Sequence, residues 1–192
     1  MYMPPADSLD TSLFGVAAPE AESKRSEIQC EVIRLFDELR TPALRYVLCL
    51  GVSVHDGEEV IQEVFLALLR HLRLDRPRNN LRGWVFRVAH NLALKRLQAI
   101  HRSREATEAD WASVQCRPDP SRDPEEQFSD TQRRKRLLAV FRSLAEEDQC
   151  CLRLRAEGLR YREIASVLGM SLGAISKSLT RSLARMARED EE

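Results

Sequence analysis

The sequence predicts an all-α protein of two small helical domains joined by a flexible acidic linker, the second domain being a helix-turn-helix (winged-helix-like) domain. Apolar residues recur with the 3.6-residue period of helices, and no stretch alternates convincingly as β-strands do. Residues 103–131 interrupt this pattern with three prolines and eight acidic residues against three basic ones, a composition typical of linkers. Residues 158–186 carry turn and capping residues at the spacing of a helix-turn-helix.

Charge is balanced over the whole chain but unevenly distributed along it. The 192 residues include 30 basic and 30 acidic ones, so the net charge of zero neither indicates nor excludes a nucleic-acid partner. Residues 81–104, however, carry six Arg or Lys and no acid. The zero net charge is therefore the sum over two basic helices and the acidic segment that separates them. The length of the chain is sufficient for two small domains.

The N-terminal part of the chain predicts an arm followed by two helices. Residues 1–25 contain three prolines and no apolar period, which predicts a disordered arm before a first domain over 26–102. An amphipathic helix is expected over 26–40. Thr41 and Pro42 then predict the cap and first turn of a second helix, which ends at a glycine, Gly51.

Two further helices complete the first domain. One is expected over 56–70, with acids at its start as the helix dipole prefers. After a polar loop, the next begins at Asn80, and its apolar residues follow a near-ideal helical period.

Helices resume near Gln132, which defines a second domain over 132–188 followed by an acidic tail over 189–192. The acidic residues 146–148 open one helix, and Gly158 closes it.

The helix-turn-helix is predicted from small, polar and apolar residues in a fixed order. Ala165 allows two helices to approach closely, Gly169 supplies the turn, and Ser171 caps a second helix. The inward-facing apolar set is Ile164, Leu168, Leu172, Ile175 and Leu179. Residues 171–188 contain no Asp or Glu and four basic residues, which favours a surface that meets DNA phosphates.

The sequence contains no recognisable catalytic, metal or cofactor site. None of the five cysteines (Cys30, Cys49, Cys116, Cys150, Cys151) forms a Cys-x-x-Cys pair or lies at zinc-finger spacing from a histidine. Their odd number predicts reduced thiols, most of them small apolar core residues. No apolar run reaches membrane-spanning length and no signal-peptide pattern is present, so we expect a soluble, cytoplasmic protein that is not an enzyme.

Blocks in each domain make the chain resemble a known family. Residues 56–70, DGEEVIQEVFLALLR, resemble the acidic Asp-Ala-Glu-Asp-Leu-Val-Gln-Glu-Val-Phe block of bacterial sigma factors, and LRGWVFRVAHNLALKRLQ resembles the Trp-Leu-Phe-x-Ile-Ala-x-Asn block that follows it. LLAVFRSLAEEDQCCLRLRAEGLRYREIASVLGMS is similar to their promoter-reading helix-turn-helix. Over residues 30–101 and 132–188, the chain resembles the compact extracytoplasmic-function branch of the sigma-70 family. It departs from the pattern at Ala145, at Lys95 and within the recognition helix.

The resemblance implies a protein that binds core RNA polymerase and places it on promoters, with no cofactor. The helix over 56–70 would dock on the polymerase through Asp56, Glu59, Gln62, Glu63 and Phe65. The −10 element, including its melted strand, would lie against Arg78, Asn79, Asn80, Arg82, Asn91 and Lys95. Double-stranded DNA at the −35 element would meet Arg160, Arg162, Ser171, Ser176, Lys177, Ser178, Thr180 and Arg181. An anti-sigma protein that holds the chain inactive would be a further partner.

Several of these residues also have a structural interpretation. Val64 and Phe65 suit the core, Asn80 is equally suited to cap the helix that follows it, and Trp84 lies on an apolar stripe. A free-standing helix-turn-helix regulator would explain residues 132–188 but would leave the helix over 56–70 without a role. A thiol redox sensor would rest on the adjacent cysteines alone.

Overall fold

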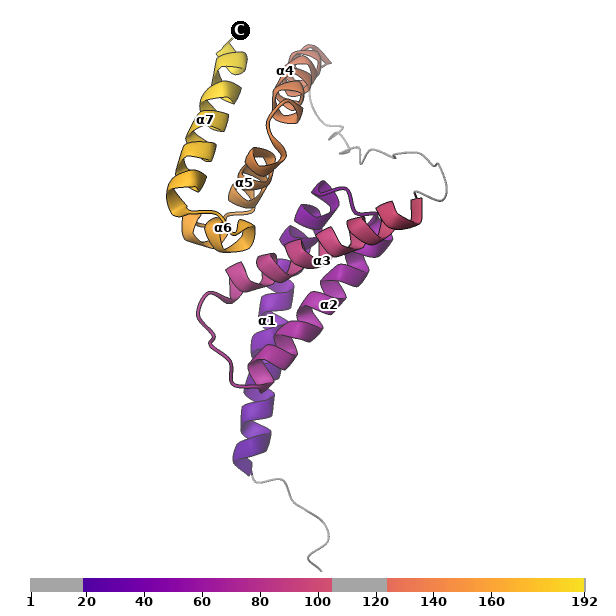
Figure 1. The fold of residues 1–192 in the computed structure, drawn as a ribbon, viewed down its shortest axis with the longest axis vertical. Coiled ribbons are helices and arrows are strands. Elements are labelled where there is room, and N and C mark those ends of the chain that lie inside the picture. Colours follow the sequence, from indigo (N-terminus) through magenta and orange to yellow (C-terminus); the bar gives the residue numbers. More distant parts are fainter. Residues whose placement is uncertain (1–18, 105–123, 192) are drawn as a thin grey trace, which may run out of the picture.

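The computed structural model describes the backbone of residues 19–104 and 124–191 and the side chains of residues 22–102 and 132–189. Every regular element in this part of the chain is a helix, which confirms the predicted all-α class. The helices of the first domain are α1 (Pro19–Cys49), α2 (Val54–Arg73) and α3 (Leu81–Arg104). Those of the second domain are α4 (Pro124–Arg142), α5 (Glu146–Ala156), α6 (Tyr161–Leu168) and α7 (Leu172–Glu191) (Figure 1).

Helix α1 is continuous through Pro42, so the predicted break at Thr41 and Pro42 is wrong. Proline lacks an N–H and therefore leaves one helical carbonyl without its usual donor. The apolar stripe continues on both sides of Pro42, where Leu39 and Ala43 are fully buried. Burial of this stripe against the other helices outweighs the loss of one backbone hydrogen bond.

The boundaries of the predicted arm, linker and tail also differ from the structure. Helix α1 begins at Pro19, so part of the predicted N-terminal arm is helical, and residues 1–18 lie outside the described backbone. Both α3 and α4 extend into the predicted linker, of which residues 105–123 lie outside the described backbone. The last helix, α7, continues into the predicted acidic tail.

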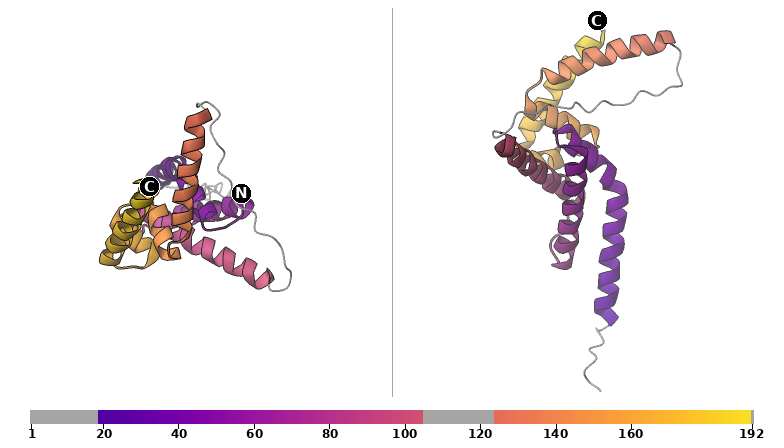
Figure 2. Two further views of the ribbon diagram at one scale, coloured as in Figure 1. Left: turned by 90° about the horizontal axis from the view of Figure 1, so that it is seen from above. Right: turned by 90° about the vertical axis from the view of Figure 1, so that its right-hand side faces the viewer.

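The first domain is a three-helix unit in which α1, α2 and α3 all contact one another. Leu39, Val47, Leu68, Val85 and Phe86 are fully buried in its centre. The N-terminal part of α1 extends past the end of α2 (Figure 2).

The two domains pack against each other. Helix α6 lies against α3, and α5 contacts α1 (Figure 1). The buried apolar residues form one continuous cluster, which runs from Leu39 and Val85 in the first domain to Leu154 and Ile164 in the second. The described helices therefore share a core across the domain boundary.

Polar contacts reinforce this boundary at the end of α5. The carboxylate of Glu157 accepts two hydrogen bonds of 2.6 Å from the guanidinium of Arg45, and its backbone carbonyl accepts one of 2.6 Å from Arg82. The side chain of Glu157 is only 9% exposed. One residue of the second domain is therefore held by cations from both α1 and α3.

A second polar contact across the domain boundary involves Tyr46, the residue that follows Arg45 in α1. The hydroxyl of Tyr46 is 2.9 Å from Nδ1 of His90, and Cys150 of α5 lies against the same hydroxyl. Burial raises the pKa of Tyr46 and of Cys150 and lowers the pKa of His90. All three groups are therefore neutral at pH 7 in the folded protein.

Candidate nucleic-acid interface

Helices α6 and α7 form the helix-turn-helix that the sequence predicts. Gly169 ends α6 with φ of 67°, a left-handed conformation that other residues adopt at a cost. The Ser171 hydroxyl accepts a 3.2 Å hydrogen bond from the backbone N–H of Ala174, so it caps α7 as predicted. At the start of α6, the Glu163 carboxylate accepts a 2.6 Å hydrogen bond from the backbone N–H of Arg160.

The predicted inward-facing set is confirmed except at one position. Ile164, Ile175 and Leu179 are fully buried and Leu168 is half-buried. Leu172 is 46% exposed, so its prediction as a core residue is wrong. It is the first residue of α7 and lines a groove.

Helix α7 presents part of its predicted DNA-contacting set to solvent. Ser176, Lys177 and Thr180 are exposed. Ser178 is 4% exposed and its hydroxyl donates a 2.6 Å hydrogen bond to Asp148, so the prediction that it meets DNA is wrong. Arg181 remains exposed, but its guanidinium donates to the same carboxylate over 2.6 Å.

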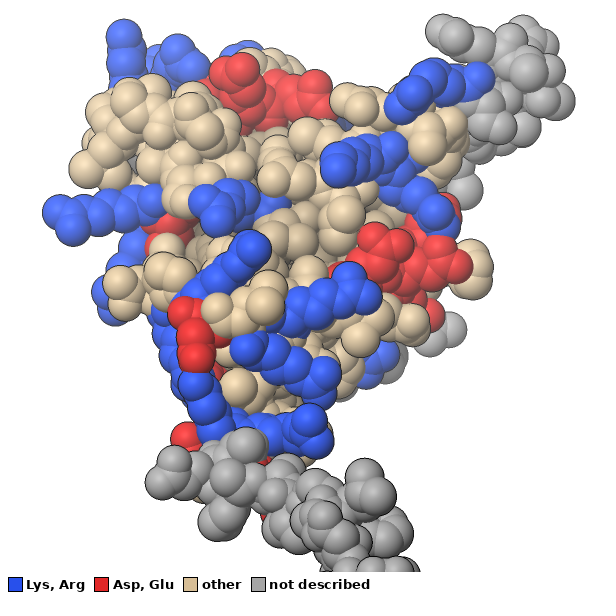
Figure 3. All heavy atoms as spheres, turned by 60° about the horizontal axis from the view of Figure 1, so that its bottom comes forward, with Lys and Arg blue, Asp and Glu red and all other residues tan. Residues whose placement is uncertain are grey.

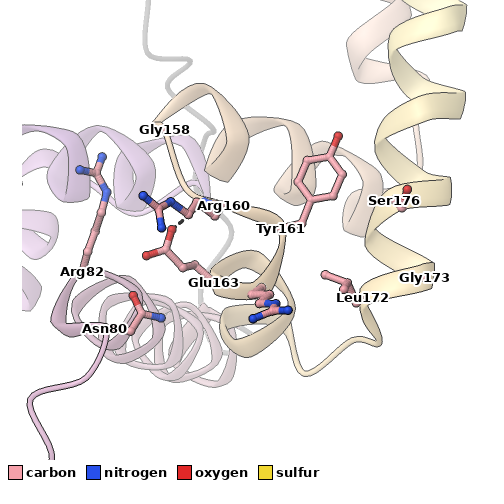
Figure 4. A pocket seen from close by; sticks show the side chains of 10 residues that line it. Asn80, Arg82, Gly158, Arg160, Tyr161, Glu163, Leu172, Gly173 and Ser176 are labelled. Atoms are coloured by element: carbon pink, nitrogen blue, oxygen red, sulfur yellow. Dashed lines mark hydrogen bonds between the residues drawn. The ribbon is translucent and has the colours of Figure 1, made fainter.

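A groove of about 1170 Å³ lies between the helix-turn-helix and the start of α3. Residues predicted separately for the two promoter elements meet there, as Figure 4 shows: Asn80 and Arg82 from the first domain, and Arg160 and Ser176 from the second. Arg162 also lines it. The groove is thus lined by three arginines and one carboxylate, that of Glu163, and the Arg82 guanidinium already donates to the backbone carbonyl of Glu157.

Asn80 caps α3, which confirms the structural alternative for this residue. Its side-chain oxygen accepts a 3.1 Å hydrogen bond from the backbone N–H of Gly83, and its own φ is 58°, a left-handed value that asparagine tolerates. A Cβ at position 83 would lie 2.4 Å from the Asn80 amide nitrogen. A side chain at position 83 would therefore require the Asn80 side chain to shift from its capping position.

Some of the other candidates for the −10 element pair with groups within the chain, and others are exposed. Arg78 pairs with Glu31 at 2.8 Å, and Arg82 is held by Glu157. Asn79, Asn91 and Lys95 are exposed. The molecular face shown in Figure 3 carries more Lys and Arg side chains than Asp and Glu side chains, and the acidic ones gather in separate clusters.

In the acidic helix α2, some of the predicted polymerase-contacting side chains are exposed, and others pair with a residue of α3. Glu63 and Gln62 are exposed. Asp56 and Glu59 both pair with Arg96 of α3. The hydrogen bond from Ser53, and then the contact with Arg96, holds the pKa of Asp56 below its usual value.

Two aromatic side chains near these sites are packing residues. Phe65 is 6% exposed and contacts Phe36 edge-on with 4.9 Å between ring centroids, so its predicted contact with the polymerase is wrong. Trp84 is half-buried and its ring lies 4.8 Å from the ring of His71, which agrees with its predicted packing role.

The thiols divide in the same way. Cys150 and Cys151 are buried, whereas Cys30 and Cys49 are exposed and Cys116 lies outside the described residues. The described cysteines therefore do not bear out the prediction that most of the five are core residues. Among the described residues, no three His, Cys, Asp or Glu side chains form a group that could hold a metal ion. None of the described helices has the length and apolar character needed to span a membrane.

Sequence reasoning missed Asp148, Glu157, Arg45 and Arg96. Their partners lie 30 to 112 residues away in the chain. The acidic run 146–148 indicated a helix start, but nothing in it distinguishes the buried Asp148 from its two exposed neighbours.

Two family models match the chain in the order of its domains. Sigma-70 region 2 matches residues 35–103, and Sigma-70, region 4 matches residues 134–186. The chain is 36% identical over 146 residues to the ECF RNA polymerase sigma factor ShbA of Streptomyces griseus, which covers 71% of this chain and 72% of that protein. It is 32% identical over 134 residues to the ECF RNA polymerase sigma factor SigE of Mycolicibacterium smegmatis, but there it spans only about half of the relative's length, 51%.

Solved structures share the fold. The sigma factor RpoE in complex with the anti-sigma factor NepR from Bartonella quintana superposes with a TM-score of 0.61 at 16% identity, covering 81% of this chain and 93% of that one. CnrH in complex with the cytosolic domain of CnrY gives 0.52 at 19% identity, covering 88% and 92%.

Proposed function

Because this chain belongs to the extracytoplasmic-function branch of the sigma-70 family, we propose that it binds core RNA polymerase and directs it to promoters through −35 and −10 elements. The observation that carries this proposal is the exposed face of α7. It presents Ser176, Lys177 and Thr180 on a helix that contains no acid from Ser171 to Arg188. A cation flanked by hydroxyls on a recognition helix suits base edges and phosphates in a major groove.

The second domain is proposed to read the −35 element. Lys177 lies in the first half of α7, the part that normally reaches base edges. Arg160 and Arg162 lie at the start of α6, beside the same groove, and are proposed to hold the DNA backbone.

The first domain is proposed to hold the −10 element. Asn79, Asn91 and Lys95 are exposed and can donate hydrogen bonds to bases or phosphates. Arg78 and Arg82 each have an acidic or carbonyl partner within the chain, so their use on DNA requires exchange of that partner.

Core polymerase is proposed to bind α2. Glu63 and Gln62 provide exposed polar groups there, and Phe36, Leu44 and Ile61 contribute to the small groove that Gln62 also lines. This role requires no catalytic residue in the chain, since the polymerase performs the chemistry. A protein that acts with bacterial RNA polymerase works in the cytoplasm, and an anti-sigma factor is a further proposed partner.

Run-off transcription with purified core polymerase over genomic DNA fragments tests the proposal. We expect discrete transcripts that depend on this chain and start downstream of a shared sequence. A free-standing regulator would bind DNA without retaining core polymerase in a pull-down and would start no transcript, and that result would overturn the proposal.

A further inference from the structure

The carboxylate of Asp148 lies buried between α5 and α7. The residue is 6% exposed. One oxygen accepts a 2.6 Å hydrogen bond from the Ser178 hydroxyl, and the other accepts one of 2.6 Å from the guanidinium of Arg181. A single side chain of α5 therefore holds α7 at two points.

These two points, together with the buried side chains of Ile175 and Leu179, fix the rotation of α7 about its own axis. Ser178 and Arg181 are three residues apart and share one face of the helix. Residues advance by about 100° each around a helix, so positions two residues from Ser178 point away from α5. Those positions are Ser176 and Thr180, and both are exposed. Lys177 is also exposed and lies at the edge of this face, about 40° around the helix from Arg181.

Rotation of α7 by one residue would break both hydrogen bonds together. Burial alone would raise the pKa of Asp148, but the hydrogen bonds from Ser178 and Arg181 outweigh it and the pKa lies below its ordinary value. The carboxylate is therefore ionised at neutral pH. An ionised carboxylate left buried without partners is strongly unfavourable, so alternative rotations of α7 are disfavoured.

We propose that Asp148 is a positioning residue for promoter recognition, which fixes the rotation of α7 so that Ser176, Lys177 and Thr180 face the −35 bases. In this arrangement Arg181 belongs to the lock formed by Asp148, Ser178 and Arg181, and it is not a phosphate contact. This inference rests on the proposed function, because it concerns the same helix and the same DNA element.

The experiment measures binding of holoenzyme, assembled from the full chain and core polymerase, to a library of −35 sequences at several salt concentrations. Asp148→Asn and Arg181→Gln should each reduce the preference for the best −35 sequence about tenfold. The double variant should lose no more than Asp148→Asn alone, because that change already alters the acceptor of the Arg181 hydrogen bond. The salt dependence should stay unchanged in all three, because no phosphate contact is lost.

Two control variants separate this role from general stability and charge. Glu147→Gln makes the same change in charge at the exposed neighbouring position and should leave the preference unchanged. Leu154→Val removes a methylene group from the buried face of α5 and lowers the melting temperature without touching the lock. Its −35 preference should equal that of the unaltered chain. If Asp148→Asn does not fold, Ser178→Ala tests the lock from α7.

The overturning results differ from one another. In one case, Arg181→Gln lowers the slope of log affinity against log salt concentration by about one unit and leaves the sequence preference unchanged. That result would identify Arg181 as a phosphate contact. Asp148→Asn with an unchanged preference, or with a loss matched by Leu154→Val, would remove the positioning role. An unaltered holoenzyme that selects no sequence would overturn the proposed function, and this inference with it.

Discussion

Lys177 is exposed on α7, and its side chain is free of the contact with Asp148 that holds Arg181. We expect Lys177→Ala to relax the preference at one or two −35 positions and to cost about 1–3 kcal/mol on the best sequence, because a base contact is lost. Arg188→Ala, near the end of the same helix, should affect all sequences alike. Binding to the −35 library gives both results. An equal loss on every sequence for Lys177→Ala would mean that α7 enters the groove in another orientation.

His90 makes the stability of the folded chain depend on pH. Burial lowers the pKa of His90, so the folded state favours the neutral imidazole beside Tyr46 and Cys150. An unfolded histidine binds a proton near pH 6.5. Below that pH the unfolded state binds more protons, so the stability contributed by neutral His90 is lost as the pH falls toward the folded pKa.

His90→Gln should therefore flatten the decrease in the free energy of unfolding between about pH 7 and pH 5. Urea denaturation at each pH measures it. His55→Gln, at a histidine whose side chain is 84% exposed, is the control variant, and its slope should be steeper than that of the His90 variant. Equal slopes for the His90 variant and the control would contradict the assignment.

At the scale of the element, the proposed polymerase contact of α2 can be separated from its internal packing. Glu63 is exposed, whereas Glu59 pairs with Arg96 within the domain. Glu63→Lys should weaken binding to core polymerase about tenfold with an unchanged melting temperature, because only a rim charge changes. Glu59→Lys should lower the melting temperature as well, since it places a cation beside Arg96. Affinity for core polymerase and thermal melting, measured together, distinguish the two. Normal affinity in folded Glu63→Lys would place the docking surface elsewhere.

Local sequence signals predicted helices and turns well, but they predicted the long-range partners of individual side chains poorly. The turn at Gly169 and the cap at Ser171 depend on residues within four positions of each other, so the chain order reveals them. The helix break predicted at Pro42 is wrong because burial of the apolar stripe on both sides of Pro42 outweighs the loss of one backbone hydrogen bond. The burial of Ser178 depends on Asp148, 30 residues away, and no periodicity identifies that partner. The sequence therefore could not distinguish the basic side chains of the candidate site that are free from those that pair within the chain.

At the scale of the whole molecule, Arg45 is the exposed partner in one of the polar contacts that join the domains. Arg45→Met should leave the Glu157 carboxylate nearly buried without its cation, which weakens the contact by about 1–3 kcal/mol. We expect a larger radius of gyration in small-angle X-ray scattering. Arg34→Met, at another exposed arginine of α1, is the control and should scatter as the unaltered chain does. An unchanged radius for Arg45→Met would show that the apolar contact alone holds the domains together.

The packing of α6 on α3 has a consequence for occupancy of a promoter. Elements at −35 and −10 lie about 25 base pairs apart, which is about 85 Å of B-form DNA. Domains in direct contact cannot span that length, so DNA that engages both must select the separated form. The observed dissociation constant is then the intrinsic one divided by the fraction of molecules that are already separated. Each 1.4 kcal/mol of contact between the domains raises the concentration needed for half-occupancy about tenfold. Under the proposed function, residues outside the proposed DNA-contacting set, such as Glu157, thereby affect how much of this protein a promoter requires.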